Sequence, residues 1–266
     1  MTILDQIVAD KRKEVAENKE LYPVKLLERS IFFGAKTVSL KHYILRSDLH
    51  GIIAEFKRKS PSKGIINEFA RPGQVCLGYM QAGASALSVL TDGPYFGGSK
   101  NDLITARRSN YCPILRKEFI VDEYQIVESR SIGADAILLI VDMLSDAELT
   151  GFFNLARSLG MEVLFEVHDR EGVARLPSDA QIVGVNSRNL GDFSVNTEHA
   201  VSMAALLPKA VVKVAESGIN SAEVYHTFRD SGYCGFLIGE HFMREPNPGK
   251  ACELFISTLK KRRTCL

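Results

Sequence analysis

The chain has 266 residues, of which 45% are hydrophobic and 24% are charged, so it can build one large hydrophobic core. Its net charge of +1, from 33 basic and 32 acidic side chains, predicts neither a nucleic-acid partner nor binding to an anionic membrane. The 5 cysteines lack metal-ligand spacing, and no apolar run approaches the roughly 20 residues of a membrane span. We therefore expect a cytoplasmic globular protein with reduced thiols. We expect it to be a monomer, with weak self-association as the alternative.

Residues 1–48 are expected to form a helical extension packed on the main domain. The apolar residues between Ile3 and Val8 recur at helical spacing, and the charged run Lys11–Glu14 falls on the other faces of that helix. Pro23 suits the first turn of a second short helix. The chain through Leu40 is expected to be irregular and to lead into the first strand.

From Gly51 onward, short apolar runs alternate with amphipathic helical segments. The predicted strands are 52–56, 86–90, 113–117, 136–141, 162–167, 182–186, 211–215 and 235–238. The predicted helices are 71–81, 102–109, 123–131, 147–158, 170–175, 198–206, 222–229 and 250–260. About eight strand–helix units over roughly 215 residues match the number and length of a (β/α)8 barrel, so we predict an α/β fold, a single-domain TIM barrel over residues 1–266. A doubly wound open sheet is the alternative, but it would usually have fewer and less evenly spaced units.

Charged residues stand at the carboxyl ends of alternate predicted strands. The first strand leads into Glu55 and Lys57, the third into Lys117, the fifth into Glu166 and the seventh into Glu216. Side chains alternate along a strand, so each of these residues shares the face of apolar residues that would fill the barrel. Alternate strands contribute to one layer of a barrel interior, so these side chains should converge. One such pair could be a structural ion pair, but four strand ends aimed at one point predict an acid–base site.

The chemistry of this ring follows from its residue types. Interleaved lysines and glutamates in a partly dry pocket shift one another's pKa values, so that one group acts as an acid and another as a base. The 6 histidines have no ligand spacing and the chain has no dinucleotide fingerprint, so we expect neither a metal nor another cofactor. A Schiff base on one of the two lysines is the alternative.

Glycines follow the last two predicted strands, in Ser217-Gly218 and in Gly239-Glu240. In a barrel, backbone N–H groups and a short extra helix bind phosphate at this place. A lone glycine after a strand is usually a turn residue, but two neighbouring strands with a hydroxyl beside one favour a phosphate site. The basic run 57–63 is interpreted as a lid over an anionic substrate, with a solvated loop as the alternative, and the basic run 260–263 as a helix end without function.

Longer motifs run through the chain in a fixed order. They are IAEFKRKSPSKG at 53–64, SVLTD at 88–92, FGGS at 96–99, PILRKEF at 113–119, EVH at 166–168, VNSRNL at 185–190 and AESGI at 215–219. Together they resemble the signature of the indole-3-glycerol-phosphate synthase family, and the resemblance covers essentially the whole chain. It implies ring closure of 1-(2-carboxyphenylamino)-1-deoxyribulose 5-phosphate to an indole, with loss of CO2 and water, in tryptophan biosynthesis.

The resemblance also implies roles for individual residues. Lys117 would be the acid for the ketone oxygen, Lys57 would hold the substrate carboxylate, and Glu166 would be the base of the dehydration. Glu55 and Glu216 would orient their neighbours. The substrate-binding residues would be Asn186, Arg188, Phe96 and Phe119, and the phosphate-binding residues Ser60, Ser217, Gly218, Gly239 and Glu240.

Two positions depart from the family pattern. His241 stands where the family typically has serine, which puts a side-chain phosphate contact in doubt, and Gly93 stands where an acidic residue is common. Neither departure touches the charged ring.

Two other functions stay open at this point. An isomerase or epimerase acting on a phosphorylated sugar would share the phosphate glycines, but it would not need two lysines and three glutamates at the mouth of the barrel. A non-catalytic binding barrel would have no reason to bear the desolvation cost of a complete charged ring.

Overall fold

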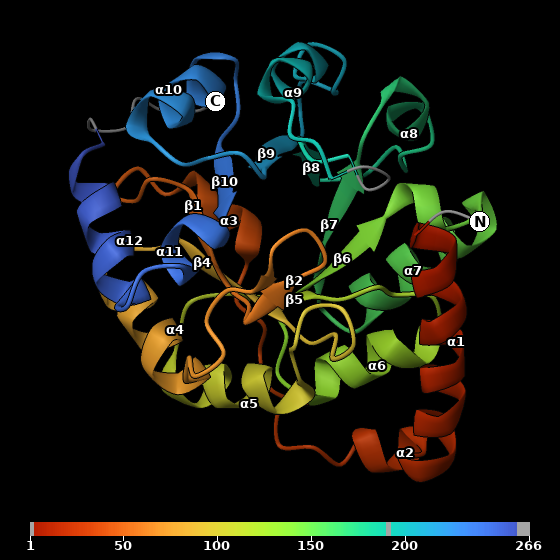
Figure 1. Cartoon of the computed structure of the whole chain (residues 1–266). Helices are drawn as coiled ribbons and strands as arrows, with labels where there is room; N and C mark the ends of the chain where they lie inside the picture. Colours follow the sequence, from red (N-terminus) through yellow and green to blue (C-terminus); the bar gives the residue numbers. More distant parts are fainter. Residues whose placement is uncertain (1–2, 190–192, 260–266) are drawn as a thin grey trace.

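The computed structural model describes residues 3–189 and 193–259, which form a closed barrel of parallel strands with helices around it (Figure 1). Around the barrel the strands follow the order β1-β10-β9-β8-β7-β6-β5-β4. They are β1 (Ile52–Phe56), β4 (Ala86–Leu90), β5 (Ile114–Lys117), β6 (Ala136–Ile140), β7 (Glu162–Val167), β8 (Ile182–Asn186), β9 (Val212–Glu216) and β10 (Gly235–Ile238). The predicted α/β class and (β/α)8 barrel are confirmed.

Helices follow the strands in the predicted alternation. They are α4 (Pro72–Gln81), α5 (Lys100–Ser109), α6 (Glu123–Ser131), α7 (Asp146–Ser158), α8 (Arg170–Ala174), α9 (Thr197–Met203), α10 (Ala222–Asp230), α11 (Glu240–Met243) and α12 (Pro248–Ser257), with the short 3-10 helix η1 (Val141–Met143) after β6. The last helix begins before the predicted position because Asn247 caps it and Pro248 fits its first turn. The helix ends at Ser257, with Thr258 as its cap, so the predicted end at 260 is wrong. The basic run 260–263 lies outside the described residues.

Strand side chains alternate between an inner and an outer hydrophobic core. Ile53, Leu115 and Leu164 lie in the inner core, whereas Ala54 and Phe56 belong to the outer core that packs against the helices. Each fully buried large apolar side chain contributes about 1.5–3 kcal/mol to folding. The predicted parity is confirmed, and it decides which charged residues at the strand ends face the barrel interior.

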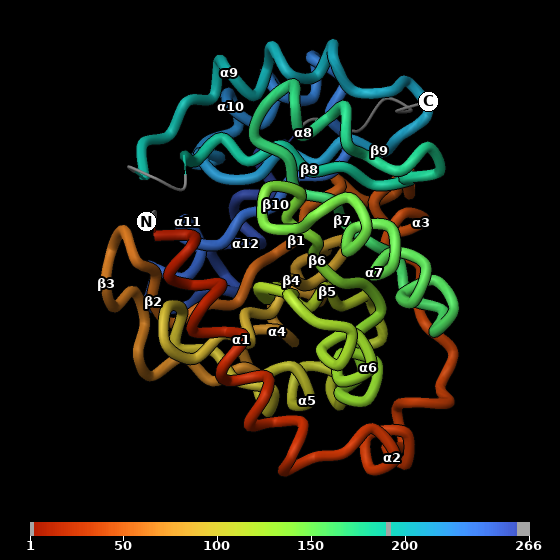
Figure 2. Tube along the Cα trace, turned by 90° about the vertical axis from the view of Figure 1, so that its right-hand side faces the viewer, coloured from red at the N-terminus to blue at the C-terminus, as the bar shows by residue number. Residues whose placement is uncertain are grey.

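The described residues before β1 form three helices, of which the first and the third lie at opposite ends of the barrel. They are α1 (Ile3–Leu21), α2 (Val24–Leu27) and α3 (Leu40–Leu45). Figure 2 shows α1 and the hairpin of β2 (Lys59–Ser60) and β3 (Gly64–Ile65) at one end, with α3 at the other. Leu40 and Ile44 of α3 are fully buried in the inner core, so this helix closes the amino-terminal end of the barrel.

The prediction of irregular chain through Leu40 is wrong, because Leu40 is the first residue of α3. The Ser39 hydroxyl accepts a hydrogen bond from the His42 N–H and donates one to Glu162 at 2.6 Å. The same carboxylate accepts a hydrogen bond from the Lys41 N–H at 2.8 Å. This short helix therefore depends on a carboxylate from β7, which the local sequence does not reveal.

The structure describes four of the 5 cysteines, and all four are buried. Cys76, Cys112 and Cys252 are free thiols, Cys234 is the fourth, and Cys265 lies outside the described residues. Within residues 3–189 and 193–259, no helix combines the length and the apolar character that crossing a bilayer would require.

Candidate active site

A cavity of about 450 Å³ opens at the carboxyl ends of the barrel strands. Its walls come from the loops after most of the strands, so residues far apart in sequence meet there. All the residues that the sequence assigned to catalysis, to substrate binding or to phosphate binding line this cavity: Glu55, Lys57, Ser60, Phe96, Lys117, Phe119, Glu166, Asn186, Arg188, Glu216, Ser217, Gly218, Gly239 and Glu240.

The first charged pair of the cavity comes from the end of β1. The Lys57 ammonium lies 2.8 Å from Glu55 Oε1, and the Ser88 hydroxyl from β4 is 3.5 Å from Glu55 Oε2. Glu55 is buried, whereas the Lys57 side chain remains partly open to the cavity. The pair therefore offers an ammonium whose position is fixed by a buried carboxylate.

The second charged group joins three strands. Lys117 Nζ, from β5, lies 3.1 Å from Glu166 Oε2 of β7 and 3.6 Å from Glu216 Oε2 of β9. Both carboxylates are buried. The Asn186 side-chain amide donates to the other oxygen of Glu166 at 3.0 Å. The predicted convergence of alternate strands is thus present in the geometry.

The two carboxylates beside Lys117 differ in their pKa values. Burial alone would raise the pKa of Glu166, but Lys117 and His168 outweigh it and hold that pKa below its ordinary value. Burial and the neighbouring Glu166 charge raise the pKa of Glu216 to about 8. Glu166 is therefore the ionised member at neutral pH, and Glu216 carries a proton.

The pKa of Lys117 lies above its ordinary value. Burial would lower it, but the charges of Glu166, Glu216 and Glu55 more than compensate. Lys117 is consequently an ammonium over the whole neutral range, which suits a proton donor and does not suit an amine nucleophile.

A histidine that the sequence did not single out stands behind Glu166. His168 Nε2 is 3.4 Å from Glu166 Oε1, and its Nδ1 is 2.7 Å from Asp142 Oδ2. His168 follows Glu166 by two positions, so the alternation used for Glu55 and Lys57 could have placed it on the same face. Asp142 lies in η1, and no local signal connects it to His168.

Two glycines make room for the buried carboxylates. A Cβ on Gly239, after β10, would clash with Glu55 Oε1, and a Cβ on Gly184 of β8 would clash with Glu216 Oε1. Any larger side chain would displace these carboxylates, which are fixed by neighbouring strands. Gly239 thus has a packing role in addition to the phosphate role that the sequence predicts.

The turn beyond β9 contains a non-glycine residue in a strained backbone conformation. Ser217 has φ of 67° and Gly218 has φ of 77°, so two successive residues adopt the left-handed region. For a non-glycine residue this conformation costs energy of order 1–3 kcal/mol, and such residues gather at ligand sites. A Cβ on Gly218 would also come within 2.8 Å of Thr197. The turn therefore holds Ser217 and Gly218 against the cavity in a conformation that few residues tolerate.

Arg188 connects three of the loops around the cavity mouth. Its guanidinium lies 3.4 Å from Glu240 Oε2, 3.3 Å from the Ser62 hydroxyl and 3.2 Å from the Phe193 carbonyl. Arg188 and Glu240 thus neutralise one another. The Glu240 carboxylate is therefore paired with Arg188. The group of Glu240 that could donate a hydrogen bond to a phosphate is its backbone N–H.

Some side chains of the basic run after β1 line the cavity, and others contact the rest of the protein. Arg58 binds Asp102 through both terminal nitrogens, at 2.6 and 2.9 Å, and the Lys59 ammonium donates to the Pro94 carbonyl at 2.6 Å. Their charges are therefore occupied within the protein. Lys57, Ser60 and Lys63 line the cavity. Arg58 and Lys59 thus hold the hairpin in place, and the interpretation of this run as a lid over substrate stays a prediction.

Two aromatic side chains form one wall of the cavity. The ring centroids of Phe96 and Phe119 are 6.0 Å apart. Asp92 Oδ2 accepts hydrogen bonds from the N–H groups of Tyr95 and Phe96, and Glu118 Oε1 accepts one from the Phe119 N–H. The backbone of both aromatic residues is therefore fixed by buried carboxylates.

Lys11 of α1 lies between these two carboxylates. Its ammonium is 3.0 Å from Asp92 Oδ1, 3.2 Å from Glu118 Oε1 and 2.7 Å from Glu14 Oε2. Only 2% of the Lys11 side chain is exposed, so its assignment to the helix faces away from the apolar residues is wrong. The reason is tertiary, because two acidic residues from the ends of β4 and β5 offset the cost of burying the charge.

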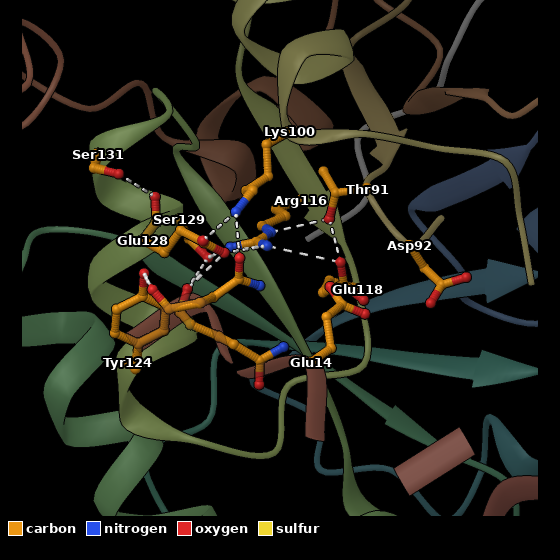
Figure 3. Close-up of polar contacts among 12 residues, drawn as sticks. Glu14, Thr91, Asp92, Lys100, Arg116, Glu118, Tyr124, Glu128, Ser129 and Ser131 are labelled. Carbon is orange, nitrogen blue, oxygen red and sulfur yellow. Dashed lines mark hydrogen bonds and ion pairs between the residues drawn. The ribbon is translucent and has the colours of Figure 1, made fainter. Parts of the chain in front are cut away.

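A further buried network of polar side chains lies outside the barrel wall, beside the Glu118 carboxylate (Figure 3). Arg116 Nη2 is 2.7 Å from Glu128 Oε2 and 3.7 Å from Glu118 Oε2, and Arg116 Nε donates to the Thr91 hydroxyl at 3.0 Å. Lys100 of α5 also binds Glu128, at 2.8 Å. Arg116 and Lys117 are adjacent on β5, so their side chains point to opposite faces of the strand. Arg116 points outward into the buried network, and Lys117 points inward to the cavity.

Comparison with known proteins gives a consistent result over the whole chain. A family model described as indole-3-glycerol phosphate synthase matches residues 4–255. The indole-3-glycerol phosphate synthase of Bacteroides thetaiotaomicron is 43% identical over 258 residues, which cover 97% of this chain and 99% of that protein. The protein of the same name from Carboxydothermus hydrogenoformans is 40% identical over 263 residues, covering 96% and 99%.

Solved structures resemble the chain in fold alone. The tryptophan synthase subunit alpha from Legionella pneumophila has a TM-score of 0.58 at 13% identity, covering 83% of this chain and 96% of that chain. A structure titled "Native KDPGal structure" has a TM-score of 0.55 at 15% identity, covering 77% and 90%.

Proposed function

Because the chain belongs to the indole-3-glycerol phosphate synthase family, we propose that its cavity closes the indole ring of 1-(2-carboxyphenylamino)-1-deoxyribulose 5-phosphate. Members of this family are decarboxylating lyases of tryptophan biosynthesis. The observation that carries the assignment of residues is the Lys117 ammonium, held between an ionised Glu166 and a protonated Glu216 inside the cavity.

The first step joins the ring carbon that carries the carboxylate to the ketone carbon of the substrate. Negative charge develops on the ketone oxygen, and Lys117 supplies the proton that neutralises it. The raised pKa of Lys117 supports this role over a Schiff base, because a Schiff base would need the neutral amine. CO2 then leaves and restores the aromatic ring.

The aromatic end of the substrate is assigned to the wall of Phe96 and Phe119, whose rings offer an apolar surface for stacking. Lys57, fixed by Glu55, would bind the carboxylate beside that ring. The carboxylate must leave its ammonium partner as neutral CO2, so this contact serves orientation more than stabilisation of the leaving group.

The last step removes water across the new bond. Glu166 is the proposed base, because Lys117 and His168 keep it ionised and Asn186 orients one of its oxygens. The Asn186 amide would also contact a substrate hydroxyl, and Arg188 would support this side of the mouth. Because Glu166 lies beside Lys117, this one pair can supply both the base and the acid of the reaction.

The phosphate is assigned to the loops beyond β9 and β10 and to the hairpin after β1. Backbone N–H groups of Ser217, Gly218, Gly239 and Glu240, with the Ser60 hydroxyl, are the proposed donors. Arg244 also lines the cavity here and adds a positive charge that the sequence did not indicate.

All of these residues come from one chain, so we propose that a monomer is sufficient for activity. The cytoplasm is the proposed location, in keeping with the free thiols of Cys76, Cys112 and Cys252. Sedimentation of the active protein at assay concentration would test the monomer directly.

A single assay tests the proposed function. The protein is incubated with 1-(2-carboxyphenylamino)-1-deoxyribulose 5-phosphate, and the fluorescence of the indole product is followed. Turnover that saturates with substrate is expected. A protein that leaves this substrate unchanged but interconverts a phosphorylated sugar would instead be an isomerase or epimerase.

Glu216→Gln is expected to keep kcat within about threefold of wild type at pH 6–7, a change of less than 1 kcal/mol. The reason is that Glu216, with a pKa of about 8, is protonated and neutral in this range, and glutamine imitates that form. Above pH 8 the wild-type carboxyl loses its proton and changes the charge beside Lys117, whereas glutamine cannot. Profiles of kcat against pH should therefore differ only on the alkaline side. A large loss at pH 6 would mean that Glu216 acts as an ionised group.

His241→Ser is expected to change KM by less than about tenfold, or ~1.4 kcal/mol, and to leave kcat nearly unchanged. Burial and the nearby Arg244 lower the pKa of His241, and Arg244 Nη2 is 3.2 Å from its Nδ1. A neutral imidazole adds little to phosphate binding when backbone groups are the main donors. Steady-state kinetics measure both constants. A collapse of kcat would place His241 in the chemistry and remove the phosphate from this loop.

A further inference from the structure

Given the proposed function, the phosphate site combines donors from parts of the chain that are far apart in sequence. The Ser60 hydroxyl belongs to the hairpin of β2 and β3, whereas the N–H groups of Gly239 and Glu240 belong to the loop after β10 and the start of α11. A phosphate can bind to both parts only at a fixed separation, because a hydrogen bond weakens when its donor and acceptor lie beyond about 3.2 Å. Residues that fix this separation therefore contribute to binding without contacting the phosphate.

Asn67, which follows the hairpin, joins these two parts. Its side-chain amide donates a hydrogen bond to the carbonyl of Met243, the last residue of α11, at 3.0 Å. Its backbone N–H donates to the Arg58 carbonyl, at the base of the hairpin, at 3.0 Å. Asn67 lines a second cavity, of about 290 Å³, beside these elements. We infer that Asn67 is a positioning residue of the phosphate site, which it serves through α11 and the hairpin.

The backbone of Asn67 is a fixed anchor for its side chain. The Arg58 carbonyl also accepts a hydrogen bond from the Ile66 N–H, at 2.8 Å. The Arg58 guanidinium donates to the buried Asp102 of α5 through two nitrogens and to the Gly97 carbonyl at 3.1 Å. The base of the hairpin is therefore held against a helix of the barrel, and the Asn67 amide has a firm support.

The helix α11 depends on such outside contacts. It has 4 residues, and a single turn is not stable by its own hydrogen bonds. The buried side chains of Phe242 and Met243 hold it to the core, and the Asn67 amide supplies a partner for its last carbonyl. The Met243 N–H donates to the Gly239 carbonyl at 2.9 Å. A shift at Met243 would therefore displace Gly239 and Glu240, which provide the proposed phosphate donors.

Arg188 also joins the two parts, through Ser62 at 3.3 Å and Glu240 at 3.4 Å. It lines the active-site cavity, however, so its replacement would remove a substrate contact together with a positioning contact. The contacts of Asn67 lie behind the phosphate donors. Changing its side chain therefore tests positioning alone.

The test is Asn67→Leu, which keeps a similar shape without a charge and without a hydrogen-bond donor. We expect KM to rise about threefold to tenfold, the usual effect of losing one hydrogen bond. We expect kcat to stay within about twofold of wild type, because the phosphate is remote from the reacting atoms and Glu55 still holds Lys57.

Two inhibitors localise the effect. The inhibition constant of inorganic phosphate should rise by the same factor as KM. That of 2-aminobenzoate, which has the aromatic ring and the carboxylate of the substrate but no phosphate, should stay unchanged. Asn110→Ala is the matched control, because the Asn110 amide also donates to a helix carbonyl, that of Ala106 at 2.7 Å, before β5 and away from the cavity. This control should leave KM and both inhibition constants as in wild type.

The outcomes separate this inference from the proposed function. Wild-type protein that does not convert the carboxyphenylamino substrate would overturn the proposed function, and calorimetric titration with inorganic phosphate would then still compare the binding of phosphate to wild type and Asn67→Leu. With active wild type, a KM that rises less than about threefold would overturn the role of Asn67. A fall in kcat at unchanged KM, or an equal rise of both inhibition constants, would show a structural role and overturn it as well. Asn67→Ala gives the decisive measurement if Asn67→Leu does not fold.

Discussion

Lys117→Met is expected to lower kcat by about 10²–10⁴-fold, the usual effect of removing a positioned general acid. Lys117 is the ammonium closest to both Glu166 and Glu216, at 3.1 and 3.6 Å. Methionine fills a similar volume without a proton to donate. The two carboxylates left behind can share a proton with each other, so the fold should tolerate the change better than the chemistry does.

The loss should appear in kcat more than in KM, because Lys117 acts on charge that develops in the transition state. Steady-state kinetics with the indole fluorescence assay measure it. Lys213→Met is the matched control, since Lys213 lies on β9 and donates to the Ala204 carbonyl at 2.7 Å, away from the cavity. Circular dichroism of both variants checks that the barrel is intact.

Two results would contradict the assignment of Lys117. A loss as small as that of Lys213→Met would make Lys117 a structural cation. Inactivation of wild type by borohydride only in the presence of substrate, and its absence in Lys117→Met, would show a Schiff base on Lys117. The expected result is that borohydride leaves activity unchanged.

Lys11→Met is expected to lower the free energy of unfolding by about 3–5 kcal/mol, the usual cost of removing one partner from a buried ion pair. The 2%-exposed Lys11 side chain faces Asp92 and Glu118, which have almost no access to water. Without the ammonium, two buried carboxylates lie close together. Because they also fix the backbone of Phe96 and Phe119, KM should rise as well.

Denaturant unfolding of Lys11→Met and of Lys13→Met, which changes an exposed lysine of the same helix, measures the difference. Burial would lower the pKa of Lys11, but Glu118 and Asp92 outweigh burial and raise that pKa above its ordinary value. The Lys11 ammonium therefore stays charged throughout the neutral range, and the stability that it contributes should be missing from Lys11→Met at pH 7.

A second substitution isolates the charge. Lys11→Met combined with Glu118→Gln removes one of the two facing carboxylates, and it should recover part of the lost stability at pH 7. Equal stabilities of the Lys11 and Lys13 variants, or no recovery in the double variant, would show that Lys11 contributes by packing alone.

The sequence by itself determined the barrel and the position of its charged ring. Local signals were sufficient because side chains alternate along each strand, and a closed parallel barrel brings alternate strand ends together. Glu55, Lys117, Glu166 and Glu216 therefore had to meet once the strands were identified. Local signals also placed helix starts to within a few residues, as at α7, which begins one residue before the predicted 147 because Ser145 and Glu148 form a reciprocal cap there.

Only the tertiary structure decided the protonation states of those charged groups. Glu166 and Glu216 have the same signal in the sequence, a glutamate at the end of an apolar strand. They differ because Glu166 has Lys117, Asn186 and His168 around it, whereas Glu216 lies farther from the ammonium and close to Gly184. A pKa depends on burial and on the distance to each neighbouring charge, and neither can be obtained from one strand.

The same reason explains Lys11 and His168. A lysine on a charged helix face is usually exposed to solvent and a histidine is often partly exposed, whereas here each contacts carboxylates from distant parts of the chain. Asp92 and Glu118 meet Lys11 because α1 packs beside the ends of β4 and β5. Asp142 meets His168 because β6 and β7 are neighbours in the barrel. Alternation along a strand gives the direction of a side chain, but the contacts that set its charge are formed only when the barrel closes.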